Sequence, residues 1–285
     1  MKKIALSAFS DEAACSILDQ VTALKRNDIF YTELRSLDGK NVSSFCESES
    51  KEYAKIFAEE GIKVWSIGSP LGKVDIDVNF NEYKDTVKKV CQTANIFGTD
   101  KIRMFSFFNA YDKKEMVFDY LNAMVEIATE YGVTLYHENE KDIFGDVAKR
   151  VVDIMENVKG LKYIYDPANY LQVGEKADDT LSLLHSKTDY FHIKDVIVST
   201  GELVPAGHGD GKIDKLVDMI NDEKTLTLEP HLAVFDAYKS IDNTEMKHKF
   251  KFSSNGEAFD CAVNSLKEII LQKGYRFDGK VFVKE

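Results

Sequence analysis

The feature that most constrains the fold is a regular alternation of short apolar runs with longer amphipathic segments along the chain. The apolar runs read as strands, and the segments between them carry apolar residues near a 3.6-residue period, as helices do. The expected strands are Lys3–Phe9, Phe30–Arg35, Lys63–Ile67, Lys101–Phe107, Thr134–Glu138, Leu161–Asp166, Tyr190–Lys194 and Leu226–Glu229. The expected helices are Ser16–Arg26, Ser48–Glu60, Phe80–Phe97, Lys113–Tyr131, Gly145–Val158, Asp178–His185, Ile213–Asn221 and Asn255–Lys273.

This alternation predicts an α/β protein, and its eight units predict a closed (β/α)₈ TIM barrel. Strands joined through helices lie parallel in a sheet that the helices cover. No GxGxxG or P-loop pattern follows the first strand, which disfavours an open nucleotide-binding sheet. A single domain over residues 1–285 fits the length. Residues 233–254 break the alternation and are interpreted as a lid, an oligomer contact or an insertion without a direct role.

Four side chains that can bind a metal or move a proton stand at the ends of the last four strands. They are Glu138, Asp166, His192 and Glu229. The carboxyl ends of barrel strands meet at one face, so we expect these side chains to converge. Three carboxylates in one pocket repel each other and require a cation. The pattern therefore predicts one divalent metal ion, with Mn²⁺ preferred and Zn²⁺, Mg²⁺ or Co²⁺ compatible. The alternative is a hydrogen-bonded network that closes the barrel mouth.

Lys194 is a candidate for substrate contact, because strand alternation places it on the same face as His192. A buried cationic group needs a partner. We expect it to bind a substrate oxygen, to hold Asp166, or to close the barrel through a salt bridge.

Three more side chains are candidates for substrate contact. Glu33 and Arg35 share one face of the second strand, and we expect one of them to point inward, either to substrate or to a structural ion pair. His208 lies in a glycine-rich loop, residues 205–211, whose backbone can approach a ligand closely. The alternative for His208 is an exposed position on a flexible turn.

The net charge of the chain indicates which class of partner it binds. The net charge is −11, whereas nucleic-acid-binding proteins usually carry a basic face, so a small-molecule substrate is favoured over DNA or RNA. Residues 1–6 begin like a strand, and no apolar run reaches the roughly 18 residues that span a membrane. These observations predict a cytoplasmic protein without a membrane partner, and they leave a homo-oligomer possible.

In their sequence context the four strand-end residues resemble the metal ligands of the xylose isomerase-like barrels. The segments that carry the resemblance are YDPANY at 165–170, FHIKD at 191–195 and LEPH at 228–231. Further segments resemble the bacterial sugar phosphate isomerases and epimerases, namely ELRSLDGKNV at 33–42, GSPLGKV at 68–74 and RMFSFF at 103–108. The resemblance covers nearly the whole chain. The superfamily also contains ketose 3-epimerases, inosose dehydratases and endonuclease IV.

The resemblance implies a metal-dependent isomerase or epimerase that acts on a small sugar or sugar phosphate. It implies that Glu138 and Glu229 remove and return a proton beside a carbonyl, while Asp166 and His192 mainly hold the metal. Such a reaction passes through an enediolate, whose charge a metal stabilises. Pure metal ligation is the alternative for each glutamate. The alternatives for the whole protein are a dehydratase of the inosose type and a non-catalytic sugar-binding barrel.

The chain departs from two subgroups of this superfamily. Ketose epimerases carry an arginine a few residues beyond the metal-binding histidine, where this chain has Val196-Ile197-Val198. Endonuclease IV needs several additional histidines for three zinc ions, and only six histidines occur here. The resemblance therefore names the superfamily and leaves the substrate open.

Overall fold

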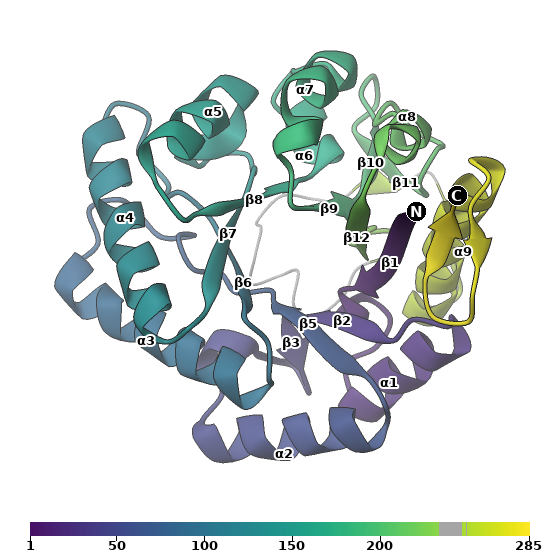
Figure 1. Cartoon of the computed structure of the whole chain (residues 1–285), viewed down its shortest axis with the longest axis horizontal. Helices are drawn as coiled ribbons and strands as arrows, with labels where there is room; N and C mark the ends of the chain where they lie inside the picture. Colours follow the sequence, from purple (N-terminus) through teal and green to yellow (C-terminus); the bar gives the residue numbers. More distant parts are fainter. Residues whose placement is uncertain (234–246, 249) are drawn as a thin grey trace.

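The computed structural model describes residues 1–233, 247–248 and 250–285. Within these residues, eight parallel strands close into a barrel with helices around it, which confirms the predicted (β/α)₈ fold (Figure 1). Each barrel strand pairs with the next one along the chain, and the last pairs with the first from Lys3 beside Glu223 to Ala8 beside Leu228. The barrel strands are β1 (Lys2–Ala8), β2 (Tyr31–Leu34), β5 (Lys63–Ile67), β6 (Lys101–Met104), β7 (Thr134–Glu138), β8 (Lys162–Tyr165), β9 (Tyr190–Ile193) and β12 (Glu223–Leu228).

The helices form the outer layer, and two of them start at serine capping groups. Ser16 and Ser254 accept hydrogen bonds from the N–H groups of Asp19 and Glu257, as helix N-caps do. The helices in the described residues are α1 (Ile17–Arg26), α2 (Glu47–Glu59), α3 (Phe80–Ile96), α4 (Lys114–Glu130), α5 (Ala148–Asn157), α6 (Pro167–Gln172), α7 (Ala177–Leu184), α8 (Ile213–Met219) and α9 (Asn255–Gln272).

The fourth barrel strand is shorter than predicted. It ends at Met104, three residues before the expected Phe107, because the chain turns there and Phe107 adopts a positive φ of 69°. The N–H groups of Phe105 and Phe107 then bond to the carbonyls of Leu71 and Gly72, at 2.7 and 2.9 Å. A Cβ at Gly72 would lie 2.0 Å from the Phe105 carbonyl oxygen, so this contact requires glycine.

The helix α6 was not predicted, and it fixes the position of one expected metal ligand. Asp166 follows β8 and is the N-cap of α6, where its Oδ1 accepts a hydrogen bond from the N–H of Asn169 at 3.1 Å. Pro167 occupies the first turn, where its missing N–H has no cost. The Asp-Pro pair therefore starts a helix directly at the strand end, instead of a loop.

The described residues also contain short strands besides the eight strands of the barrel. The predicted lid or insertion at residues 233–254 lies mostly outside the described residues. Of that stretch, β13 (Lys247–His248) pairs with β11 (Glu202–Val204), which itself pairs with β10 (Asp195–Ile197). The short strands are β3 (Ser36–Leu37), β4 (Lys40–Asn41), β10 (Asp195–Ile197), β11 (Glu202–Val204), β13 (Lys247–His248), β14 (Arg276–Phe277) and β15 (Phe282–Lys284).

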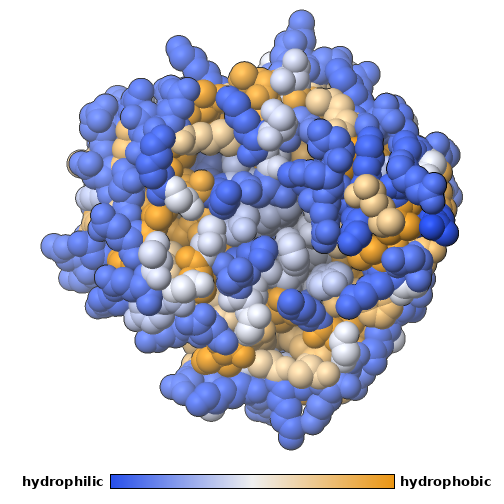
Figure 2. All heavy atoms as spheres, viewed as in Figure 1, coloured by the Kyte–Doolittle hydropathy of each residue, from blue (hydrophilic) through white to orange (hydrophobic). Residues whose placement is uncertain are grey.

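The apolar core lies between the strands and the helices. Outward-facing Ile102, Leu226 and Leu228 are buried there with Leu121 of α4 and Leu266 of α9. Seen along the barrel axis, hydrophilic residues dominate the rim, and residues of intermediate hydropathy gather at the centre (Figure 2). No helix among the described residues is long and apolar enough to cross a membrane.

His137, next to Glu138 on β7, points to the opposite face of the strand and is fully buried there against Ser106 and Tyr163. Burial lowers its pKa from 6.5 to about 3. Between pH 6.5 and 3 the unfolded chain gains a proton that the folded chain does not, so stability falls as the pH falls through this window.

We expect His137→Gln to reduce that pH dependence. The slope of the unfolding free energy between pH 6.5 and 4 should decrease by up to about 1.4 kcal/mol per pH unit, the value for one proton. Urea unfolding at several pH values measures this slope. His208→Gln is the matched control, because His208 is exposed. An unchanged slope in His137→Gln would contradict the prediction.

Candidate metal centre

The structure brings together the four side chains at the strand ends. One ligand atom from each of Glu138, Asp166, His192 and Glu229 lies within 4.8 Å of the others, and all four residues are buried. Glu138 is the last residue of β7, and His192 lies within β9. Asp166 and Glu229 directly follow β8 and β12. Their convergence follows from the barrel, which places the carboxyl ends of all its strands at one face.

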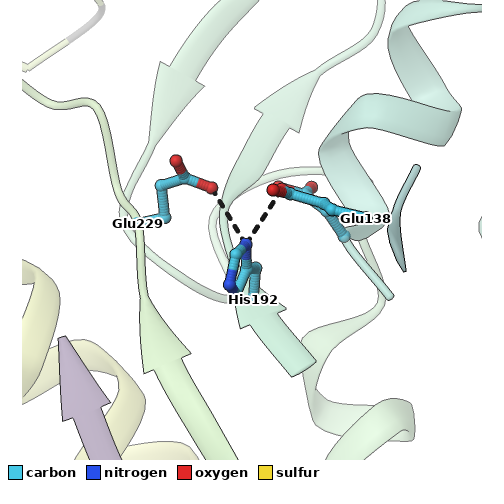
Figure 3. Close-up of side chains that lie close together, drawn as sticks. Glu138, His192 and Glu229 are labelled. Carbon is cyan, nitrogen blue, oxygen red and sulfur yellow. Dashed lines mark hydrogen bonds and ion pairs between the residues drawn. The ribbon is translucent and has the colours of Figure 1, made fainter. Parts of the chain in front are cut away.

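His192 lies at the centre of this cluster. Its Nδ1 is 2.9 Å from Oε1 of Glu138 and 3.2 Å from Oε2 of Glu229, so the two glutamates approach one ring nitrogen from two sides (Figure 3). Burial alone would lower the pKa of His192, but the carboxylates of Glu138 and Glu33 raise that pKa well above 6.5. The imidazolium of His192 therefore offsets part of the negative charge of the neighbouring glutamates.

Lys194 supplies a second positive charge from the same face as His192. Its Nζ lies 2.8 Å from Oδ2 of Asp166 and 3.7 Å from Oε2 of Glu229. Burial and the two neighbouring glutamates raise the pKa of Asp166 to about 6, in spite of Lys194. For Glu229 the outcome is opposite: burial alone would raise its pKa, but Lys194 and His192 hold it well below 4.5. Lys194 therefore holds Asp166, one of the roles predicted for it.

The oxygen atoms of the cluster fit a divalent ion. Oδ2 of Asp166 and Oε2 of Glu229 are buried and accept no hydrogen bond of suitable geometry from the described residues, although Lys194 and His192 lie nearby. A buried carboxylate oxygen without such a bond is costly. Three carboxylates and one imidazole are donors that Mn²⁺, Zn²⁺, Mg²⁺ or Co²⁺ accept. Glu138, Asp166, His192 and Glu229 are thus the residues that would hold the ion.

Both charged residues of the second strand lie in the buried cluster, whereas we expected only one to point inward. The pairing of β2 with β5 shifts register between Thr32 and Glu33. Glu33 contacts His192, and Arg35 extends beyond the end of β2 to Oε1 of Glu229 at 3.0 Å. Alternation already places both residues on one face of the strand, so the expectation that only one would point inward was too narrow.

Arg35 also reaches two acidic residues that the sequence analysis did not single out. It forms a bidentate pair with Asp11, with both distances at 2.9 Å, and lies 3.3 Å from Glu12. Burial raises the pKa of Asp11, although Arg35 lowers it in part. The loop after β1 thus supplies part of the charge that surrounds Glu229.

Arg103 is a site residue whose role the sequence analysis missed. Its Nη1 lies 3.1 Å from Oε2 of Glu138 and 3.6 Å from Oε1 of Glu229. Its guanidinium carbon lies over the rings of Phe9 and Phe105, at 4.8 and 4.9 Å. The available signal was a charged residue inside an otherwise apolar strand.

The predicted substrate residue His208 lies apart from these contacts. It is exposed, and its ring packs edge-on against Phe250 at 5.6 Å. Its loop is fixed by Asp195, whose carboxylate accepts the N–H groups of Gly207, Gly209 and Gly211 at 2.8 to 3.0 Å. A Cβ at Gly209 would lie 2.4 Å from Asp195, so the glycines serve this hydrogen-bonded turn.

The sequence profile of the xylose isomerase-like TIM barrel family matches residues 30–244. The chain belongs to this family. The match includes all four residues of the candidate metal centre, so the family named by the sequence resemblance is confirmed. A comparison with curated proteins finds no match.

Many solved structures share the fold. One is the D-psicose 3-epimerase determined in the presence of D-fructose, 12% identical, with a TM-score of 0.73 over 96% of this chain and 100% of that one. Another is the IolI protein with a bound zinc atom, 15% identical, with a TM-score of 0.72 over 96% and 99%. A third is the probable 3-DHS dehydratase AsbF from Bacillus anthracis, 14% identical, with a TM-score of 0.69 over 94% and 99%. At these identities the likeness shows the fold alone.

Proposed function

We propose that this protein is a metal-dependent isomerase or epimerase that acts on a small keto-sugar or sugar phosphate. The observation that carries the proposal is the pair of buried glutamates, Glu138 and Glu229, that meet at Nδ1 of His192 beside Asp166. The same side chains that would hold the ion are thus placed to exchange protons with whatever the ion binds. The similarity of the fold to a ketose 3-epimerase supports this class.

The chemistry follows from what these side chains can do. A bound divalent ion supplies an electrophile that polarises a substrate carbonyl and lowers the cost of removing the neighbouring proton. One glutamate takes that proton from carbon, and the other carboxyl group returns a proton to the opposite face or to the adjacent carbon. Glu229 is available to accept that proton, because Lys194 and His192 hold its pKa low and keep it ionised.

The surrounding residues would orient the substrate. We propose that Lys194 and Arg35 bind substrate oxygens, because their cationic groups lie within reach of Glu229. Arg103 would bind a substrate oxygen as well, from the side of Glu138. His208 would contact a substrate only at the outer edge, since it is exposed. Glu33, which the sequence assigned to substrate or to a structural ion pair, contacts His192.

The identity of the metal is part of the proposal. We favour Mn²⁺, because three carboxylates and one imidazole form an oxygen-rich donor set. Zn²⁺, Mg²⁺ and Co²⁺ fit the same donors, and zinc is bound by IolI, which shares the fold. A cytoplasmic location, the absence of nucleic-acid and membrane partners, and a homo-oligomer remain predictions.

A dehydratase is the second candidate, and the ion pair of Lys194 with Asp166 favours it. A buried ammonium group 2.8 Å from a carboxyl group can supply the proton that a departing hydroxyl needs. The reaction would start with the same proton abstraction and then expel a β-hydroxyl as water. The fold is also shared with a probable dehydratase. Product mass separates the two classes, because only the dehydratase product lacks the elements of water.

The test combines metal analysis with isotope exchange. Elemental analysis of the purified protein should show one divalent ion per chain. The loaded protein should then incorporate deuterium from D₂O into carbon of at least one probe among D-fructose, D-psicose, L-ribulose and their phosphates. Mass spectrometry detects this exchange, and protein stripped with EDTA is the control. Metal-loaded protein that exchanges no probe and dehydrates none would overturn the proposal.

A further inference from the structure

The two ring nitrogens of His192 face different groups. Nδ1 faces Glu138 and Glu229, at 2.9 and 3.2 Å, and both contacts meet at this one nitrogen (Figure 3). Nε2 lies 3.1 Å from Oε2 of Glu33, which belongs to a different strand. A nitrogen that binds a metal must offer its lone pair, while the other nitrogen carries the proton. The roles of the two nitrogens are therefore not interchangeable in this site.

The acceptor at Nε2 is rigidly held. The side chain of Glu33 is fully buried, and its other oxygen accepts a hydrogen bond from the hydroxyl of Tyr190 at 3.0 Å. The imidazole ring packs edge-on against Phe9 at 5.2 Å and against Tyr190 at 5.7 Å. With two aromatic neighbours and a carboxylate at Nε2, the ring is held in one orientation.

We infer that Glu33 is a positioning residue that keeps a proton on Nε2 of His192 and so directs Nδ1 to the metal. A carboxylate behind a metal-binding histidine fixes the tautomer of the ring and raises its basicity, and Tyr190 in turn orients the carboxylate. This inference rests on the proposed metal centre. It gives Glu33 a role different from the substrate contact predicted from the sequence, because both of its oxygens already bond to protein groups.

Metal titration of three variants tests the inference. Glu33→Leu removes the acceptor at Nε2, and we expect it to weaken Co²⁺ binding about 10- to 100-fold. Glu33→Gln removes the charge but keeps an acceptor, so its loss should be clearly smaller. Glu140→Gln is the matched control, because Glu140 also places a charge near Lys194 and Glu229 but pairs with Lys73 and not with His192. Its Co²⁺ affinity should stay near that of the wild type.

The outcomes separate the inference from the proposed function. Wild-type protein that binds no Co²⁺ would overturn the proposed metal centre itself. Wild-type binding with an equal loss in Glu33→Gln and Glu33→Leu, or with none in either, would overturn only the role of Glu33. An equal loss in Glu140→Gln would assign the effect to general charge and would also overturn that role.

A direct measurement covers the case in which Glu33→Leu fails to fold. Nitrogen-15 NMR of zinc-loaded wild-type protein with labelled histidine should show one ring whose Nδ1 is metal-bound and whose Nε2 is protonated. A ring with metal on Nε2 and a proton on Nδ1 would contradict the inference without any variant. Fluorescence of Trp65, whose ring lies 6.2 Å from that of Tyr190, reports whether each variant is folded.

Discussion

Glu229→Gln and Glu138→Gln should each lower the rate of deuterium exchange into a substrate by about 10²- to 10⁴-fold, the usual contribution of a positioned acid or base. Gln retains the shape and one donor oxygen of Glu but cannot take up a proton from carbon. Glu229 is ionised and so available for abstraction, because Lys194 and His192 hold its pKa low. Exchange followed by mass spectrometry in D₂O, with the metal content measured on the same samples, gives both quantities.

The metal content decides between proton transfer and ligation. A loss of exchange with the metal retained would assign proton transfer to the glutamate, whereas a loss that follows metal loss would leave it as a ligand only. Glu140→Gln is the control, because Glu140 lies two residues beyond Glu138 and pairs with Lys73 at 2.9 Å. Full exchange in both Glu138→Gln and Glu229→Gln would exclude them as acid and base.

Arg35→Met should lower the free energy of unfolding by about 3 to 5 kcal/mol, the typical cost of removing one partner of a buried ion pair. Arg35 is 1% exposed and contacts Asp11, Glu12 and Glu229. Methionine fills similar space but leaves these carboxylates close together without their cation. Urea unfolding at pH 7 measures the change, and a metal-stripped sample keeps bound ions from masking it.

The loss in Arg35→Met should also shrink as the pH falls, because protonation removes the charge of the stranded carboxylates. Burial already raises the pKa of Asp11, and the loss of Arg35 removes a group that lowers this pKa, so Asp11 takes up a proton more readily in the variant. Lys51→Met is the control: Lys51 pairs with Glu47 on the surface, and its loss should leave the free energy of unfolding near that of the wild type. A loss below about 1 kcal/mol in Arg35→Met would show that the cluster does not need this cation.

The strand-end pattern identified the four candidate ligands before any coordinates, and the reason is geometric. Glu138 and His192 are polar groups in otherwise apolar strands, and the barrel brings the carboxyl ends of all its strands to one face. Periodicity is a property of short stretches of sequence, so it can be recognised without knowing the structure. Lys194 was placed on the correct face by the same alternation.

The partners of those residues could not be predicted in the same way. Arg103 also lies inside an apolar strand, but only the closed sheet shows that it reaches Glu138 on the neighbouring strand. Alternation places Arg35 on the same face as Glu33, but only the closed fold shows that Arg35 reaches Asp11 and Glu229. Those contacts join segments far apart in the sequence, and neither segment alone encodes them.

The sequence by itself determined the barrel and the set of residues at its mouth, because alternation and strand ends are local patterns that the fold converts into position. The tertiary structure alone decided how the charges are shared: Arg35 with Asp11 and Glu229, Arg103 with Glu138, Lys194 with Asp166, and Glu33 with His192. Buried charges take whichever partner is nearest in space, since the interior offers no water to replace one. Those distances exist only after the eight strands have closed.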